Sequence, residues 1–321
     1  MSMQEAVRRT HEQFSYVPEI VHADGLHGPY KQYILGGMGG SHLAAGLLKL
    51  WKQGVNVYVH RSYDLPPYDE EFLESSLHIA CSYSGNTEET ISFAEAALDR
   101  HLPLLIITTG GALLAFAQKQ HVPHIILPST GVQPRAALGY MLIALATAVH
   151  EPVCVGDMHV LGETFRAETY QARGEEIATA IGNATPVIYA SVKNVALAYT
   201  WKIKLNETGK IPAFYNVLPE ANHNEMQGFG AGDGTYHFIM LTDEHDHSGI
   251  QRRMRVLSEM LEEVGYSVTQ VPLEGESTLA RAFASLAIAD WVSLRLAETK
   301  KRDPEAVPMV EAFKKALSRA K

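Results

Sequence analysis

The sequence predicts an α/β fold in which parallel sheets are covered by helices on both faces. Two observations predict this fold class. Short apolar segments of strand length alternate with longer helical patterns from residue 32 to residue 299. Most of these short segments are apolar on both faces, which is typical of strands buried between two helical layers. With 321 residues, the chain is long enough for two such α/β/α sandwiches of flavodoxin-like type.

The first half of the chain is expected to form a five-stranded sheet. A short amphipathic helix and a loop occupy residues 1–30, and a nearly all-apolar helix at residues 135–149 ends this half. Glycine or polar residues separate each strand from the helix that follows it. The predicted strands are residues 32–35, 55–59, 77–81, 104–107 and 124–127, and the helices between them are residues 43–51, 88–98 and one that ends at residue 118.

The second half repeats this layout without repeating its motifs. Residues 151–157 are interpreted as a linker, and a long polar helix is expected at residues 158–181. Further strands are predicted at residues 187–190, 235–241 and 267–271, and further helices at residues 194–206, 248–263 and 277–299. A tail helix, 305–320, follows Asp303-Pro304. The expected divisions are therefore residues 1–152, 153–302 and 303–321.

Composition excludes several classes of partner. The net charge is −9 and the two short basic stretches are flanked by acids, so we expect no nucleic-acid binding. No segment approaches the roughly 18 apolar residues of a membrane span, and the first residues lack the apolar core of a signal peptide. The two cysteines allow no disulfide framework, and Cys81 is interpreted as a small core residue. We expect a soluble, cytoplasmic protein that does not bind membranes.

The most informative local feature is the serine loop, residues 82–87 (Ser-Tyr-Ser-Gly-Asn-Thr), between a strand and a helix. Hydroxyl groups of Ser82, Ser84 and Thr87 and the free amides of the first helical turn converge there, where the helix dipole favours an anion. A simple helix cap through Asn86 or Thr87 is the alternative. A cap needs one such residue, and four lie within six positions, so phosphate binding is favoured.

A second strand-to-helix turn is rich in glycine. This glycine loop, residues 36–41 (Gly-Gly-Met-Gly-Gly-Ser), differs from a dinucleotide-binding pattern because His42 stands where a glycine is needed. No acidic residue ends the next strand either. Glycines that only allow a tight turn are the alternative. The pairing with the serine loop at the same edge of the sheet favours a ligand.

Polar residues in the second half provide groups for proton transfer. Residues 206–210 and 219–225 bring carboxylates, amides and His223 into loops. Polar surface turns are the alternative. A metal site through His223 and Glu225 is less favoured because no third ligand has suitable spacing. Residues 243–247 (Asp-Glu-His-Asp-His) are interpreted as a solvated loop. Arg135 opposes the dipole of its helix and needs an anionic partner, which a salt bridge at the edge of the core would also supply.

Together these segments resemble a known family. The glycine loop and the serine loop are similar to those of a sugar isomerase (SIS) domain. The wider set resembles the bifunctional phosphoglucose/phosphomannose isomerase family of archaea and bacteria, over essentially the whole chain. The further matching segments are residues 134–140 (Pro-Arg-Ala-Ala-Leu-Gly-Tyr), 206–210 (Asn-Glu-x-Gly-Lys) and 222–225 (Asn-His-Asn-Glu).

The resemblance implies two SIS domains, a homodimer, and interconversion of glucose 6-phosphate or mannose 6-phosphate with fructose 6-phosphate. No metal or organic cofactor takes part in the family. Ring opening precedes proton transfer through a cis-enediol. The implied phosphate ligands are Gly40, Ser41, Ser82, Ser84 and Thr87.

The resemblance also implies which residues carry out the reaction. Glu207 is the isomerising base, and Arg135 faces the reacting carbons. His223 opens the ring and comes from the neighbouring subunit. A lysine of the tail helix assists it. We assign this role to Lys314, which follows the apolar Phe313, and the adjacent Lys315 is the alternative.

One departure and two competing classes bear on the implied function. The family usually has Asp-Pro-Thr-Pro before the tail helix, where this chain has Asp-Pro-Glu-Ala at residues 303–306, so the glucose activity is implied more strongly than the mannose activity. Another SIS isomerase, or an aminosugar synthase with an added glutaminase domain, is one alternative. A non-catalytic sugar-phosphate sensor is another, and Glu207 and His223 would have no purpose in it.

Overall fold

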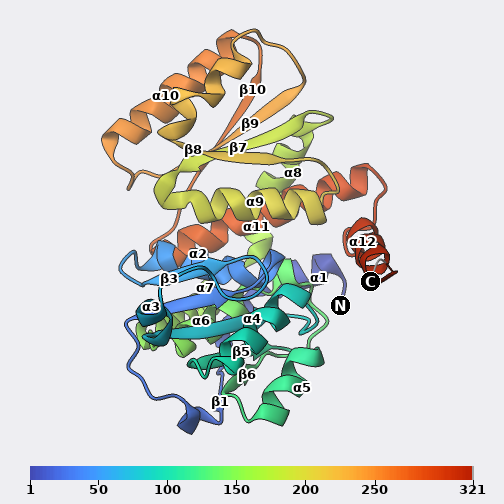
Figure 1. Cartoon of the computed structure of the whole chain (residues 1–321). Coiled ribbons are helices and arrows are strands. Elements are labelled where there is room, and N and C mark those ends of the chain that lie inside the picture. Colours follow the sequence, from blue (N-terminus) through green and yellow to red (C-terminus); the bar gives the residue numbers. More distant parts are fainter. Residues whose placement is uncertain (320–321) are drawn as a thin grey trace.

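The computed structural model describes residues 1–319, and it contains two separate sheets (Figure 1). The first sheet has the order β1-β6-β5-β4-β2-β3. All of its neighbours are parallel except β1, which is antiparallel to β6. Its strands are β1 (Ile20–Val21), β2 (Gln32–Gly36), β3 (Val57–His60), β4 (Ser76–Ser82), β5 (Leu104–Thr108) and β6 (His124–Ile126).

The second sheet is fully parallel, in the order β10-β9-β7-β8. Its strands are β7 (Thr185–Ser191), β8 (Phe214–Leu218), β9 (Tyr236–Thr242) and β10 (Ser267–Pro272). The predicted fold class, parallel sheets flanked by helices, is confirmed. Two edge strands were not predicted. β1 has two residues, and β8 is a mostly half-exposed edge strand in which Phe214 is 57% exposed, so neither has the continuous apolar pattern of a buried strand.

The helices agree with the sequence pattern in most places. The twelve α-helices of residues 1–319 are α1 (Met3–Arg8), α2 (Leu43–Trp51), α3 (Glu70–Glu74), α4 (Glu88–Asp99), α5 (Gly111–Gln120), α6 (Leu138–Ala148), α7 (Pro152–Thr164), α8 (Gln171–Ile181), α9 (Val195–Glu207), α10 (Ser248–Glu263), α11 (Thr278–Thr299) and α12 (Pro308–Arg319). The predicted end of the tail helix at residue 320 lies outside the described residues.

The interpretation of residues 151–157 as a linker is wrong. Helix α7 begins at Pro152, and proline is favoured in the first turn of a helix because its missing N–H has no partner there. The single helix expected at residues 158–181 is instead broken at Phe165, which is extended. Phe165 is buried against Phe14 and Phe283, with ring centroids 5.6 and 6.3 Å away. Tertiary packing therefore ends α7 where the polar pattern alone would continue.

One continuous core joins the two halves. Helices α2 and α6 cover the inner face of the first sheet, and α8 and α9 cover the inner face of the second. Helix α11 packs on α8 and α9, and α2 contacts both α9 and α11 (Figure 1). Helices α4 and α5 cover the outer face of the first sheet, and α10 covers the outer face of the second. This packing fixes the end of α9 beside the loops of the first sheet. No helix within residues 1–319 is long and apolar enough to cross a membrane.

Candidate functional site

Hydrogen bonds within the serine loop fix its conformation at the start of α4. Ser82 is buried, and its hydroxyl is bonded to the Thr87 hydroxyl at 2.9 Å and accepts from the Gly85 amide at 3.1 Å. Gly85 has φ +69°, and a β-carbon there would lie 1.8 Å from the Gly110 carbonyl oxygen, so the turn requires glycine. Thr87 is the N-cap residue, but its side chain makes no capping bond. The amides of the first turn therefore remain available to an anion.

The glycine loop is bonded to the serine loop and packs closely on the turn that follows β6. The Ser41 hydroxyl accepts from the Tyr83 amide at 3.0 Å. A β-carbon on Gly40 would lie 2.9 Å from the Arg135 nitrogen, so glycine at this position lets the 3-10 turn at residues 134–136 approach. Cys81 lies beneath, fully buried, and burial raises its pKa to about 12. Its thiol is therefore a core group rather than a nucleophile.

Arg135 is buried, with 1% of its side chain exposed, and it is hydrogen-bonded to two other parts of the chain. Its Nε donates to Thr208 Oγ1 at 2.8 Å, and Nη1 lies 3.3 Å from Glu207 Oε2. Its Nη2 donates to the carbonyls of Pro304 and Glu305 at 2.7 and 3.1 Å. Burial lowers the pKa of Arg135, and the nearby carboxylates oppose this shift. The residue thus has the anionic partner that its position required.

The last turn of α9 also contacts the backbone of Arg135. Lys204 donates to the Arg135 carbonyl at 3.2 Å and to Asp290 Oδ1 at 2.6 Å. Lys204, Glu207 and Thr208 are spaced by three and four residues, so they share one face of the helix. Sequence analysis identified only Glu207 here. The signal that would have found Lys204 is a charged residue on the apolar face of α9, where a buried partner is required.

A cavity of about 520 Å³ brings most of the expected site residues together. Its lining includes seven of the nine, namely Gly40, Ser41, Ser84, Thr87, Arg135, Glu207 and Lys314. Ser82 lies behind the lining, where it orients Thr87. Lys315 is not among the lining residues, so the geometry favours Lys314 over its neighbour.

His223 is an expected catalytic residue that the single chain does not bring into the lining of this cavity. It lies exposed in a 3-10 turn, Glu220–His223, and does not line the cavity. A cavity that contains a serine loop, a buried arginine and a half-exposed glutamate can hold a phosphate at one end and move a proton at the other.

Comparison with known proteins identifies the family. Residues 170–317 match the model of the bacterial phospho-glucose isomerase C-terminal SIS domain. A bifunctional phosphoglucose/phosphomannose isomerase of Thermoplasma volcanium is 35% identical to this chain, over 91% of the chain and 93% of its own length. The chain belongs to this isomerase family. The bifunctional phosphoglucose/phosphomannose isomerase of Aquifex aeolicus is 33% identical to this chain, over 91% of the chain and 92% of its own length.

A solved structure supports the fold alone. A hypothetical protein of Thermus thermophilus superposes with a TM-score of 0.71 at 20% identity, covering 99% of this chain and 86% of that one. The sequence identities to the two isomerases, not this superposition, confirm at the level of the family the resemblance predicted from the loops and from residues 206–210 and 222–225.

The family's usual Asp-Pro-Thr-Pro segment is replaced here by residues 303–306, and the structure shows where the substituted glutamate lies. Glu305 Oε1 accepts from the Met3 amide at 3.0 Å, and Glu305 does not line the cavity. Only its backbone carbonyl faces Arg135. The departure from the family pattern therefore adds no carboxylate to the lining of the site.

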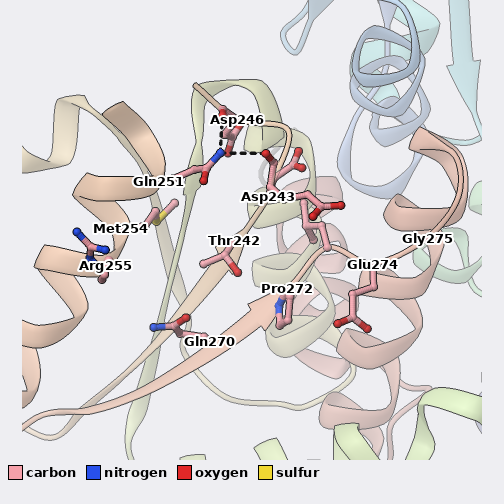
Figure 2. A pocket seen from close by; sticks show the side chains of 12 residues that line it. Thr242, Asp243, Asp246, Gln251, Met254, Arg255, Gln270, Pro272, Glu274 and Gly275 are labelled. Atoms are coloured by element: carbon pink, nitrogen blue, oxygen red, sulfur yellow. Dashed lines mark hydrogen bonds between the residues drawn. The ribbon is translucent and has the colours of Figure 1, made fainter. Parts of the chain in front are cut away.

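A second cavity, of about 420 Å³, lies at the carboxyl ends of β9 and β10 (Figure 2). Figure 2 shows Asp243 and Asp246 on the loop after β9, with Gln251 of α10 reaching the Asp246 carbonyl at 2.8 Å. Asp243 accepts from Lys193 Nζ at 2.8 Å and from Asn194 Nδ2 at 3.0 Å. The interpretation of residues 243–247 as a solvated loop is wrong for its two aspartates, which are both buried. Contacts with β7 and its following turn bury them.

This loop follows β9 as the serine loop follows β4, but it carries carboxylates in place of hydroxyls. Negative charge there disfavours a phosphate. Among residues 1–319 no group of three or more histidine, cysteine or acidic residues is arranged to hold a metal ion. The cavity that contains the serine loop is also lined by Glu88, Glu89 and Glu207, but it adds hydroxyls and free helix amides that can bind an anion.

The Asp243 cluster predicts a pH dependence of stability. Burial raises the pKa of Asp243, but hydrogen bonds from Lys193, Asn194 and the His245 amide outweigh burial and lower it to about 2. The folded pKa lies below the ordinary value, so the ionised form stabilises the fold above the ordinary pKa and loses this effect as pH falls through the folded pKa. Asp243→Asn should therefore lower the free energy of unfolding by about 2 kcal/mol at pH 7.

The difference between the variant and the unmodified chain should shrink as the pH falls from 5 toward 2. Urea unfolding at a series of pH values measures it. Glu244→Gln is the matched control, since the Glu244 side chain is 85% exposed. A cost for Asp243→Asn that stays constant with pH would contradict the assignment.

Proposed function

We propose that this chain interconverts glucose 6-phosphate and mannose 6-phosphate with fructose 6-phosphate. The observation that carries the proposal is the half-exposed Glu207 carboxylate, which Arg135 holds at 3.3 Å in the same cavity as the serine loop. Membership of the isomerase family supports the same reaction. Because the phosphate end does not react, its binding energy serves to position the other end of the sugar.

The phosphate is proposed to bind between the two loops. Ser84 and Thr87 supply hydroxyls, and the uncapped first turn of α4 supplies amides. Gly40 and Ser41 face the same space. Ser82 acts from behind, by fixing the Thr87 hydroxyl at 2.9 Å. Neutral donors and a helix dipole attract the phosphate here although the chain as a whole is acidic.

Proton transfer is proposed to follow ring opening. His223 and Lys314 remove the proton of the anomeric hydroxyl and deliver a proton to the ring oxygen, and the bond between carbon 1 and the ring oxygen breaks. Glu207 then takes the proton from carbon 2 of the aldose and returns it to carbon 1, through a cis-enediol. The oxygen on carbon 1 gains a proton as the enediol forms, and the hydroxyl on carbon 2 loses one as the ketose forms. Glu207 is a carboxylate again at the end, so atoms balance without a further reactant. Rotation about the carbon 2–carbon 3 bond presents either face of the enediol to this one base, and so admits both aldoses.

Arg135 is proposed to stabilise the negative charge that develops on the enediol oxygens. Its four hydrogen bonds to Thr208, Glu207, Pro304 and Glu305 occupy four of the five N–H groups of a guanidinium. One Nη1 N–H therefore remains for the substrate among the described contacts. Side chains supply every acid and base in this scheme, so we propose that neither a metal nor an organic cofactor is needed.

The exposed position of His223 leads us to propose a homodimer in which this residue completes the neighbouring subunit's site. A cytoplasmic location is also proposed, in keeping with the metabolic substrates. The division into residues 1–152, 153–302 and 303–321 stays a proposal. Because α7 packs against α6 and the turn at residues 10–15 of the first half, we favour a boundary after Thr164 over one at residue 152.

The base assignment predicts that Glu207→Gln abolishes isomerisation and keeps binding. Glutamine retains the shape and the bond to Arg135 but cannot accept a proton. We expect turnover to fall by about 10²–10⁴-fold, the range for loss of a general base, with little change in sugar-phosphate affinity by calorimetry. Glu263→Gln is the control, because Glu263 is the last residue of α10, as Glu207 is of α9, but is exposed and does not line the cavity.

Retained turnover in Glu207→Gln would overturn the assignment of the base. Tight binding with no turnover in the unmodified chain would instead favour the non-catalytic sugar-phosphate module. The two outcomes are read from the same coupled assay and the same titration.

The proposed exchange of His223 between subunits predicts complementation. Glu207→Gln and His223→Ala chains should each be inactive alone. In a mixed dimer, one site would combine an intact Glu207 with an intact His223. Random mixing by refolding together should therefore restore about a quarter of the sites, since half of the dimers are mixed and each has one intact site. Complete absence of activity in the mixture, with dimers present by mass photometry, would contradict a contribution across the interface.

A further inference from the structure

We propose that Lys210 is a positioning residue, which fixes the chain segment that carries Lys314 against the helix that carries Glu207. This inference rests on the proposed function, in which Lys314 opens the sugar ring and Glu207 transfers the proton. Lys210 does not line the cavity, so it is not a catalytic residue itself.

Lys210 lies at the centre of three hydrogen bonds. It follows Glu207 and Gly209 in the turn that ends α9, and its own backbone is left-handed with φ +57°. Its Nζ donates to the carbonyl oxygens of Glu207 and Ala306. Its own carbonyl accepts from Arg302 Nη1 at 2.8 Å. The turn after α9 is thus bonded through both its side chain and its backbone to the residues that precede α12.

These residues form a strap, which we define as residues 303–307. The strap has two cationic anchors, Lys210 at the Ala306 carbonyl and Arg135 at the carbonyls of Pro304 and Glu305. Each cation also holds Glu207. Arg135 contacts its carboxylate, and Lys210 contacts its carbonyl. The strap and the end of α9 are therefore connected through the same two side chains.

The strap determines where Lys314 lies, because α12 has little other support. Helix α12 packs extensively along no other helix or strand of the described chain, and in Figure 1 it lies to one side of both sheets. Phe313 is 63% exposed, and Val310 is 47% exposed. Both line the cavity beside Lys314. A helix with few packing partners is held by the segment that leads into it, so a loosened strap would move Lys314 away from the sugar.

The charges at this junction agree with a role in holding the strap. Burial lowers the pKa of Lys210, and repulsion from Arg135 lowers it further, while Asp303 and Glu207 oppose the shift. Two cations beside one another are unfavourable unless both are bonded. Carbonyl groups of the strap and of α9 supply these bonds. A side chain without the ammonium group at position 210 would lose both hydrogen bonds, to Glu207 and to Ala306, and the strap would lose this anchor.

The first test compares Lys210→Met, Lys314→Met and the double variant by kcat, KM and the catalysed anomerisation of glucose 6-phosphate, which reports ring opening. Lys210→Met should lower kcat and anomerisation at least tenfold with a smaller change in KM. If Lys210 acts through Lys314, the double variant should be no slower than Lys314→Met alone. Lys210→Arg, which keeps donors and charge, should restore part of the activity.

The second test needs no activity. Hydrogen exchange of the α12 amides should be faster in Lys210→Met than in the unmodified chain, by about tenfold for loss of one such anchor. Lys202→Met on the same helix is the matched control, since Lys202 makes none of these bonds, and it should leave exchange unchanged. Lys210→Gln replaces Lys210→Met if the latter does not fold.

Losses that multiply in the double variant, or unchanged exchange of α12, would overturn the proposal. An unmodified chain that fails to turn over any sugar phosphate would overturn the proposed function instead. The exchange measurement would then still decide whether Lys210 holds the strap.

Discussion

The buried guanidinium of Arg135 is the interaction on which the rest of the site depends. A charge with 1% of its side chain exposed is costly unless it is paired and fully hydrogen-bonded. Glu207 and Thr208 at the end of α9 and two carbonyls of the strap bond the guanidinium, and Lys204 bonds the backbone carbonyl of Arg135. Removing a partner would leave an uncompensated buried charge, at a cost of about 3–5 kcal/mol. The arginine therefore constrains three segments that lie far apart in the sequence.

This constraint explains how one cavity combines groups that can bind a phosphate with a carboxylate that can transfer a proton. The loops at the carboxyl ends of β2 and β4 belong to the first sheet and offer amides and hydroxyls to a phosphate. Glu207 ends a helix that covers the second sheet, and the continuous core between the sheets brings it beside Arg135. In the proposed reaction, the loops hold the unreactive end of a sugar, and the end of α9 meets the other end. The equivalent loop of the second sheet carries buried aspartates and so does not duplicate the phosphate site.

Local sequence patterns predicted the features that depend on neighbours in the chain. β4 and β5 are buried throughout and rich in apolar residues, and the serine loop has its hydroxyls within six positions. Features that depend on distant neighbours were missed or wrong. The pairing of Lys204 with Asp290 and the burial of Asp243 arise from packing between elements that the sequence does not place. His223 does not line the cavity of the single chain, and its proposed role depends on a second subunit that the sequence pattern does not place.

The most direct test of the account is turnover of glucose 6-phosphate and mannose 6-phosphate, side by side, by the unmodified chain with and without a chelator. Fructose 6-phosphate formation is followed by a coupled assay. The account predicts that both sugars are converted and that the chelator changes neither rate, because side chains alone supply the acids and bases. Binding of both sugars without turnover, or turnover that the chelator abolishes, would contradict it.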